Sequence, residues 1–364
     1  LSGHLKSKGR TQVLKALKNG EIDLLVGTHA LFSSDVAYND LQLAIIDEQH
    51  RFGVMQREAI ISKGRKTEKS CMAGVNEKFT FEPHLLMMSA TPIPQTLAMT
   101  IYGDLDVSII KSKPKGRKDI TTYLVKEGNE KNAYEAVRKE LMAGRQAYFV
   151  YPAIGEAEDA DDFQLTGDGK ENAKGLKSAT TAFENLSKNI FPEFPCALLH
   201  SKINEEDQER ILKDFYEGKI KILAATTVIE VGVDVPNATC IVIEGADHFG
   251  LSQLHQLRGR VGRSDLQSYC FLVYSENITE TGIERMKALR TSTDGFWLSE
   301  QDLKIRGPGE INGTLQAGAL EFSIADVVQD KEMLMAARED AGQFIIHNPK
   351  AGVFYSKVGS FRMK

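Results

Sequence analysis

The sequence predicts an α/β protein with two parallel sheets, followed by a helical C-terminal region. Short apolar runs of strand length alternate with amphipathic stretches, which is typical of βαβ units whose sheets are covered on both faces. After residue 274 the strand pattern stops and helical patterns continue. The expected strands are 22–26, 43–47, 85–89, 147–151, 197–200, 220–225, 240–244 and 269–274.

A basic segment with Pro114 and Gly116 divides these strands into two groups. Proline and glycine interrupt regular structure, so this segment is expected to be a linker between domains. We therefore expect a truncated first domain over 1–112, the linker over 113–118, a second domain over 119–274 and a helical region over 275–364.

Three further segments have a predicted conformation. A helix is expected over 129–142, because apolar residues recur there at helical spacing, and Gly144 is expected to end it. The segment 63–81 is polar with little periodicity, and 156–177 is acidic and rich in glycine. Such compositions bury too little apolar surface to offset the entropy of ordering, so both are predicted to be mobile surface loops.

The formal net charge of −5 over 364 residues argues against a uniformly basic nucleic-acid-binding protein. Any contact with DNA must therefore be local. A solvated linker and a DNA-binding patch are equally good interpretations of one basic run, which consists of Lys111, Lys113, Lys115, Arg117 and Lys118.

The cysteines and the hydropathy indicate a cytoplasmic protein. The four cysteines form no C-x-x-C pair, so a zinc site is not expected and free thiols in a reducing compartment are. The apolar runs have strand length, so no membrane span is expected. The first residues do not resemble a signal peptide.

Two adjacent carboxylates, Asp47 and Glu48, follow the apolar run 43–46. They are expected where a parallel strand ends and a ligand crevice opens. There, Asp47 would hold Mg²⁺ and Glu48 would polarise an attacking water, so both are candidate metal and catalytic residues. An ordinary junction between a strand and a loop is the alternative.

The sequence Ser89-Ala90-Thr91 follows another apolar run, and Pro92 and Pro94 direct the chain out of the sheet. The hydroxyls of Ser89 and Thr91 are expected to reach the carboxylate loop and report the state of a phosphate. An ordinary turn before a helix is the alternative.

The arginine-rich sequence QLHQLRGRVGR provides the most specific candidates. Gln256, Arg260 and Arg263 stand at i, i+4 and i+7, which predicts that they share one helix face. Arginines in such an array suit bidentate binding of a transferring phosphate. Gly259 and Gly262 would each weaken a helix by roughly 1 kcal/mol, which indicates a close approach to the backbone rather than a solvated basic helix.

The segment AATTVIEVGVD lies between these motifs. Thr226 and Thr227 are expected at a strand end, where their hydroxyls would donate to a nucleic-acid phosphate; capping of the strand end is an equal alternative. Gly232 and Asp234 are expected near a nucleotide ribose or near the arginines.

The order DEQH, SAT, TTVIEVGVD and QLRGRVGR resembles the superfamily 2 helicases. Longer matches, DEQHRFGV, SATPIPQTLAMTIYGDLDVS, FGLSQLHQLRGRVGRS and RGPGE, resemble the RecG family of bacterial ATP-dependent DNA helicases. The resemblance implies two RecA-like domains, ATP and Mg²⁺ as cofactors, and remodelling of branched DNA such as stalled replication forks.

The resemblance also implies roles for individual residues. Asp47 and Glu48 correspond to the Walker B pair, and Arg260 and Arg263 to the motif VI arginines. A single-strand backbone contact is implied for Gly27, Thr28 and His29, and a coupling role for His50, Ser89 and Thr91.

A coupling region is implied over 283–318, where a helical hairpin and a loop transmit motor movement to DNA. Arg306 and Gln316 match family positions in this region. Leu315 stands where the family usually has an arginine, so this chain departs from the family pattern at one position of that network.

The phosphate-binding motif G-x-x-x-x-G-K-[ST] does not occur in the 364 residues. We therefore expect the helicase portion of a RecG-type protein with an incomplete first domain and without the family's wedge domain. The alternatives are a translocase like the transcription-repair coupling factor and a DNA-binding module that does not hydrolyse nucleotide.

Overall fold

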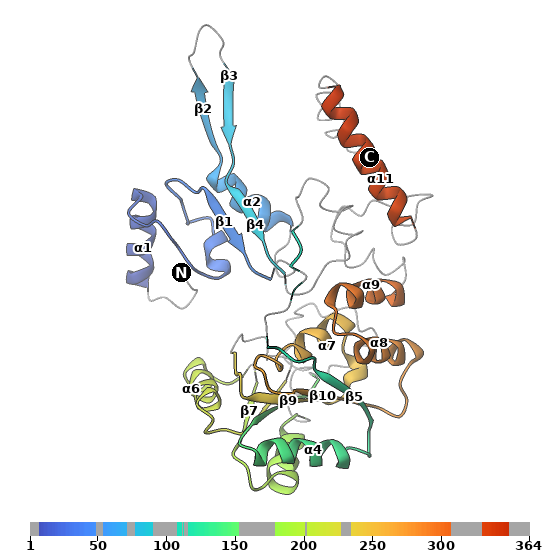
Figure 1. Cartoon of the computed structure of the whole chain (residues 1–364). Coiled ribbons are helices and arrows are strands. Elements are labelled where there is room, and N and C mark those ends of the chain that lie inside the picture. The colour runs from blue at the N-terminus through green and yellow to red at the C-terminus, as the bar shows by residue number, and fades with distance from the viewer. Residues whose placement is uncertain are drawn as a thin grey trace. The chain divides into compact units, whose positions relative to one another are not determined.

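The computed structural model describes residues 7–48, 54–70, 77–89, 108–110, 112, 116–152, 179–200, 202–226, 234–306 and 330–348. The chain forms two compact units, Leu1–Ala90 and Thr91–Lys364 (Figure 1). This division precedes the expected linker, of which 116–118 are described, and the domain boundaries remain a prediction. No helix in these ranges is long and apolar enough to cross a membrane.

The first unit contains a small parallel sheet. Strand β1 (Leu43–Ile46) pairs with β4 (His84–Met87), and both were expected from their apolar runs. The helical elements of this unit are α1 (Ser7–Asn19), the 3₁₀ helix η1 (His29–Phe32) and α2 (Val54–Gly64).

The strand expected over 22–26 is not formed. Leu24 is 81% exposed and Val26 is 75% exposed. An apolar run becomes a strand only where it pairs with a neighbour, and 22–26 pairs with neither β1 nor β4. The prediction was wrong because hydropathy alone does not supply a pairing partner.

The expectation of a structureless loop over 63–81 was also wrong. Strand β2 (Lys66–Ser70) pairs antiparallel with β3 (Glu77–Phe81) and forms a separate two-stranded sheet. Threonine and phenylalanine favour strands, but the interleaved charges concealed the alternation. We call this pair the β2–β3 ribbon. The other expected loop, 156–177, lies outside the described residues.

The second unit is built on a parallel six-stranded sheet with the order β5-β10-β9-β6-β8-β7. The edge strand β5 was not predicted, because Thr121 and Tyr123 are exposed and the strand carries no continuous apolar run. Every other strand was expected from the sequence. The strands are β5 (Thr121–Lys126), β6 (Gln146–Val150), β7 (Cys196–Leu199), β8 (Ile222–Ala225), β9 (Ala238–Ile243) and β10 (Tyr269–Tyr274).

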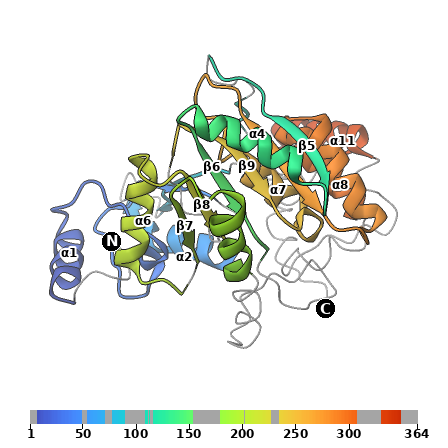
Figure 2. The ribbon, with the colours of Figure 1, turned by 90° about the horizontal axis from the view of Figure 1, so that it is seen from below.

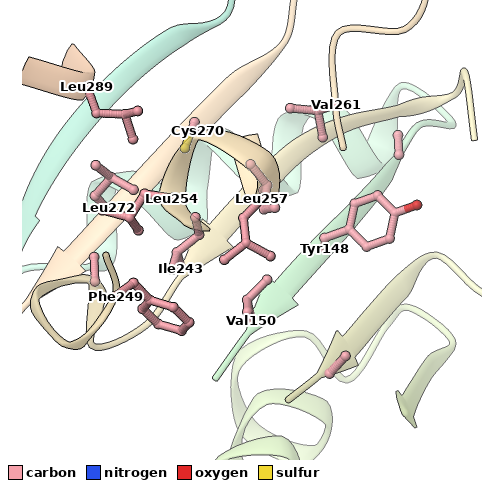
Figure 3. Close-up of a cluster of buried hydrophobic side chains, with 14 of the residues drawn as sticks. Tyr148, Val150, Ile243, Phe249, Leu254, Leu257, Val261, Cys270, Leu272 and Leu289 are labelled. Atoms are coloured by element: carbon pink, nitrogen blue, oxygen red, sulfur yellow. The ribbon is translucent and has the colours of Figure 1, made fainter. Parts of the chain in front are cut away.

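Helices cover both faces of this sheet, and each face has its own apolar core. Helix α4 (Lys131–Met142) packs on one face through Ala133, Val137 and Leu141. Helix α7 (Leu251–Arg258) packs on the other face, where its leucines meet the strands. Figure 1 shows α7 and α4 on opposite sides of the strands, Figure 2 shows α4 in front of them, and Figure 3 shows the α7 core. Gly144, with φ of +85°, follows the end of α4 as predicted.

Two further helical elements pack around the sheet. Helix α6 (Glu205–Tyr216) begins at Asn204, whose side chain accepts a hydrogen bond from the Asp207 amide. A helix over 179–185 continues as the π-helix η3 (Leu186–Ile190), and the short 3₁₀ helix η4 (Ala246–His248) precedes α7.

The described elements after β10 are all helical, which confirms the prediction of a helical C-terminal region for those residues. They are α8 (Glu280–Thr291), α9 (Gly295–Arg306) and α11 (Lys331–His347). Helices α8 and α9 contribute Met286, Leu289 and Leu298 to the α7 core, so this part of the helical region belongs to the second unit's packed interior.

Candidate functional site

The carboxylates of the first unit lie at the carboxyl edge of the β1–β4 sheet. Ile46 is the last residue of β1, and Asp47 and Glu48 follow it directly. The Asp47 carboxylate accepts a hydrogen bond from the Glu48 amide at 2.9 Å. Glu48 has φ of +51°, and it is the only non-glycine residue with positive φ in the described ranges. A glutamate in the left-handed backbone region is uncommon and persists only where the surrounding structure holds it. Residues in such backbone conformations are frequent at functional sites.

The second expected segment meets the carboxylates at this edge. In the parallel register Ile46 pairs with Met87, and the Met88 amide donates to the Ile46 carbonyl at 2.8 Å. Ser89 therefore leaves the sheet beside the point where Glu48 does. The structure thus brings the Asp47–Glu48 and Ser89 segments together. Thr91 and His50 lie outside the described residues.

The residues Gly27, Thr28 and His29 lead into η1. The Thr28 carbonyl accepts a hydrogen bond from the Leu31 amide at 3.0 Å, and His29 is the first residue of the 3₁₀ helix. The Thr28 side chain makes no capping hydrogen bond. Their role in binding a single strand remains a prediction.

The arginines of the second unit do not lie on one helix face, so that prediction was wrong. Gln256 lies in α7, but α7 ends at Arg258 and Gly259 is its C-cap. Gly262 has φ of +75°, and a Cβ there would lie 2.8 Å from Cγ1 of Ile120. The helix thus ends at Gly259, and Arg260 and Arg263 follow in a turn that a side chain at position 262 would obstruct.

Arg263 is held beside Asp234, as the sequence suggested for that aspartate. Its Nη1 lies 3.5 Å from Oδ1 of Asp234, and its Nε donates to the Gly259 carbonyl at 3.3 Å. Asp234 precedes β9, whereas Arg263 precedes β10, so two loops of the sheet supply this pair. The Arg263 side chain is 26% exposed, which leaves it accessible to a ligand.

Tyr148 lies near the turn that carries Arg260 and Arg263, which we call the arginine turn. The sequence analysis did not identify this tyrosine. Burial raises the pKa of its hydroxyl to about 12, the charges of Arg260 and Arg263 oppose that rise, and Asp234 adds to it. The charges of all three groups thus act on the hydroxyl, and the centroid of the Tyr148 ring lies 5.0 Å from that of Phe215. Figure 3 shows Tyr148 among the buried side chains of the α7 core. A tyrosine inside an apolar strand carries no sequence signal for such a position.

Arg258 is a second residue that the sequence analysis passed over. It is 2% exposed, and its Nη1 donates to the carbonyls of Leu289 at 2.5 Å and Ser292 at 2.9 Å. Its Nη2 lies 3.0 Å from Nδ1 of His255, and burial lowers its pKa. Arg258 thereby ties the start of the arginine turn to the C-terminal end of α8. The signal was present, because this is the first arginine of RGRVGR.

The remaining candidates are only partly described. Thr226 is buried, and its amide donates to the Leu199 carbonyl at 3.3 Å, beyond the end of β8. Arg306 is the last residue of α9. Thr227, Gly232, Gln316 and Leu315 lie outside the described residues.

Three family models match separate parts of the chain. Residues 2–100 match the DEAD/DEAH box helicase model, and residues 172–265 match the helicase conserved C-terminal domain. Residues 292–358 match the model described as ATP-dependent DNA helicase RecG, domain 3, C-terminal.

Similar proteins agree with the third model. An ATP-dependent DNA helicase RecG of Treponema pallidum is 51% identical over 348 residues, and that of Thermotoga maritima is 44% identical over 340. These matches cover 95% and 93% of this chain. The chain belongs to the RecG family. The resemblance noted in the sequence is thereby confirmed. This RecG-family chain spans about half the length of the relatives it matches, 47% and 40% of these two.

Solved structures confirm the predicted RecA-like α/β fold of this RecG-family chain. A RecG bound to a three-way DNA junction is 40% identical with a TM-score of 0.61, and the match covers 92% of this chain and 39% of that one. The helicase MrfA bound to DNA and AMPPNP has a TM-score of 0.53 at 15% identity, which shows the shared fold alone; the match covers 92% of this chain and 46% of that one. The RecG relatives are named ATP-dependent, so the family uses nucleotide.

Proposed function

We propose that this chain is the motor portion of an ATP-dependent DNA helicase that remodels branched DNA, coupling ATP hydrolysis to movement on DNA. The observation that carries the proposal is the similarity over 92% of the chain to a RecG that binds a three-way junction. The carboxylates at the end of β1 and the accessible Arg263 supply chemistry that suits this activity.

Asp47 and Glu48 fit a magnesium ion. Mg²⁺ in nucleotide sites is held by one or two carboxylates, with phosphate and water oxygens completing the shell. The described residues contain no cluster of three metal-ligating side chains, which suits such a sparse site better than a protein-made cage. Asp47 would hold the ion, which neutralises phosphate charge, and Glu48 would orient the attacking water.

Arg260 and Arg263 are proposed to stabilise negative charge on the transferring phosphoryl group. A planar guanidinium binds phosphate oxygens bidentately, and this interaction strengthens as charge develops. The Asp234 carboxylate holds Arg263 and would orient it before a phosphate arrives. Gln256 and Gly232 are retained as candidates for the same site. Binding of single-strand backbone by residues 27–29, Thr226 and Thr227 is also proposed.

The 364-residue chain by itself is expected to hydrolyse ATP no faster than background. It contains no phosphate-binding loop sequence, so neither backbone amides nor a lysine would position the β- and γ-phosphates. The measurement is phosphate release with and without DNA, compared between the wild-type chain and Glu48→Gln. DNA-stimulated release that Glu48→Gln abolishes would contradict this expectation. It would also show that the chain completes a nucleotide site unaided.

Replacement of Arg306 by alanine in a version that includes a phosphate-binding loop is expected to separate hydrolysis from unwinding. Arg306 is the last residue of α9, and α9 packs with α8 against α7. Arg306 is therefore at the boundary between the packed helices and the expected coupling loop. DNA-stimulated hydrolysis should remain largely intact while fork unwinding is lost. Lys304→Ala is the matched control, because Lys304 lies two residues earlier in α9 and is exposed. Wild-type unwinding by Arg306→Ala would favour a generic superfamily 2 motor.

A further inference from the structure

The proposed single-strand contact of the first unit, residues 27–29, leads into η1 and is not held by apolar burial. Gly27, Thr28 and His29 are all exposed. None of the four residues of η1 is buried. A helix of four residues is too short to be stable by itself. The position of this segment therefore depends on contacts from the residues around it.

Lys63, in the last turn of α2, binds the end of η1. Its Nζ donates to the carbonyl of Ser33, which is the C-cap of η1, and to the carbonyl of Val36 at 2.8 Å. A cation is favoured at this end of a helix, because the last carbonyls have no partner within the helix. Burial lowers the pKa of Lys63, and the charge of Asp35 opposes that change. The ammonium is thus partly removed from water and directed at the backbone that follows η1.

Two further side chains bind the same stretch of chain. The Tyr38 hydroxyl donates to the Leu31 carbonyl at 3.2 Å. Nη2 of Arg10, in α1, donates to a carboxylate oxygen of Asp35 at 2.8 Å. The end of η1 and the residues after it are therefore tied to both helices, whereas residues 27–29 are exposed.

Among these contacts, those of Lys63 are expected to matter most. The side chains of the Arg10–Asp35 pair are 24% and 48% accessible, and ion pairs in contact with solvent contribute little. Lys63 is half-buried and donates from a charged group to two carbonyls. Hydrogen bonds from a charged donor are stronger than neutral ones.

We propose that Lys63 positions residues 27–29 for contact with the single-strand backbone, by fixing the carbonyls at the end of η1. This inference rests on the proposed function, because it assigns a positioning residue to the single-strand contact proposed there. Lys63 itself does not contact the strand. A binding segment that is already ordered loses less conformational entropy when its ligand arrives, which raises affinity. Lys63 also ties this contact to α2, the helix that follows Asp47 and Glu48 in the chain.

The test is the affinity of the 364-residue chain for an oligothymidylate single strand. Lys63→Met keeps an unbranched side chain but donates no hydrogen bond, so affinity is expected to fall about tenfold. The slope of log affinity against log salt concentration should stay unchanged, whereas loss of a direct phosphate contact would make it shallower by about 0.7. Lys18→Met is the matched control, because Lys18 is an exposed lysine in the last turn of α1. It should change neither affinity nor slope.

Amide hydrogen exchange shows whether the effect is local. The amides of Leu31 and Val36 form backbone hydrogen bonds within this segment and should exchange faster in Lys63→Met. The amide of Met88, which donates across the β1–β4 sheet, should exchange as in the wild type. Lys63→Arg keeps the charge and can donate to both carbonyls, so it should restore the affinity and the slow exchange.

Four results would each overturn the inference: wild-type affinity in Lys63→Met, a shallower salt slope, an equal loss in Lys63→Arg, or faster exchange at Met88 as well. In the last case Lys63 would stabilise the whole unit rather than position one segment. Thr28→Ala and His29→Ala separate the inference from the proposed function. Weaker binding by these two variants, with wild-type binding by Lys63→Met, would reject only the positioning role. Wild-type binding by all three, or no binding by the unaltered chain, would reject the proposed contact as well.

Discussion

Replacement of Arg263 or Arg260 by alanine, in a version of the protein that includes a phosphate-binding loop, is expected to lower kcat for DNA-stimulated ATP hydrolysis by about 10³–10⁵-fold. The charge of a transferring phosphoryl group is spread over its oxygens, and a guanidinium in a preorganised position stabilises it without further rearrangement. Arg263 is already oriented by Asp234 and by the Gly259 carbonyl. Removing it would take away an interaction made chiefly in the transition state, so KM should change little.

The measurement is steady-state hydrolysis at saturating DNA, together with DNA affinity in the absence of nucleotide. DNA affinity should be unchanged if the arginines act on phosphate within the nucleotide site. Arg210→Ala provides the control, because Arg210 lies on the exposed surface of α6 with its side chain 70% accessible. Variants that lose DNA binding while hydrolysing ATP normally would show that the arginine turn contacts nucleic acid. The proposed roles of Arg260 and Arg263 would then be withdrawn.

Replacement of Arg258 by methionine is expected to destabilise the second unit by about 3 kcal/mol. Methionine approximates the length of the arginine stem but donates no hydrogen bond, so the carbonyls of Leu289 and Ser292 lose their donor in a buried setting. Hydrogen bonds from charged donors contribute more than neutral ones, and a buried acceptor left without a partner bears its full desolvation cost. The amide hydrogens in the last turn of α8 should also exchange with solvent more readily, because that turn loses its tie to α7.

Urea unfolding of the 364-residue chain measures the effect, and amide hydrogen exchange at the end of α8 localises it. Arg290→Met is the matched control, since Arg290 lies in the last turn of the same helix and is exposed. A surface change of this kind is expected to remain within about 0.5 kcal/mol of the wild type. Equal stability of Arg258→Met and the wild type would show that the hydrogen bonds from Arg258 to Leu289 and Ser292 do not hold α8 in place.

The sequence was most informative where a strand is buried on both faces. Runs such as 147–151 and 240–244 became β6 and β9 within one residue or two of the expected limits. Both are central strands, so nearly every side chain must be apolar, and hydropathy alone reveals them. A strand at the edge of the sheet need not be apolar throughout. The edge strand β5 was missed because exposed positions interrupt its apolar pattern. The converse error was 22–26, an apolar run without a strand partner in the β1–β4 sheet.

The candidate site was predictable in its residue types and only partly in its geometry. The order of the motifs identified the family, and the strand ends placed Asp47 and Ser89 at one edge of a sheet. The helical spacing predicted that the helix continues through Arg263, because the spacing of residues does not show where a helix ends. The structure ends it at Gly259, where a turn with a left-handed glycine takes over and directs the arginine to Asp234.

By itself the sequence determined the fold class, the family and the chemical identity of the candidate groups, since these depend on local apolar patterns and on the order of short motifs. Only the tertiary structure decided which groups meet. Asp234 and Arg263 approach because their loops lead into strands of one sheet, and Arg258 reaches Leu289 because α8 packs against α7. Contacts between residues far apart in the chain are fixed by packing and strand pairing, and these are properties of the assembled fold rather than of any single segment.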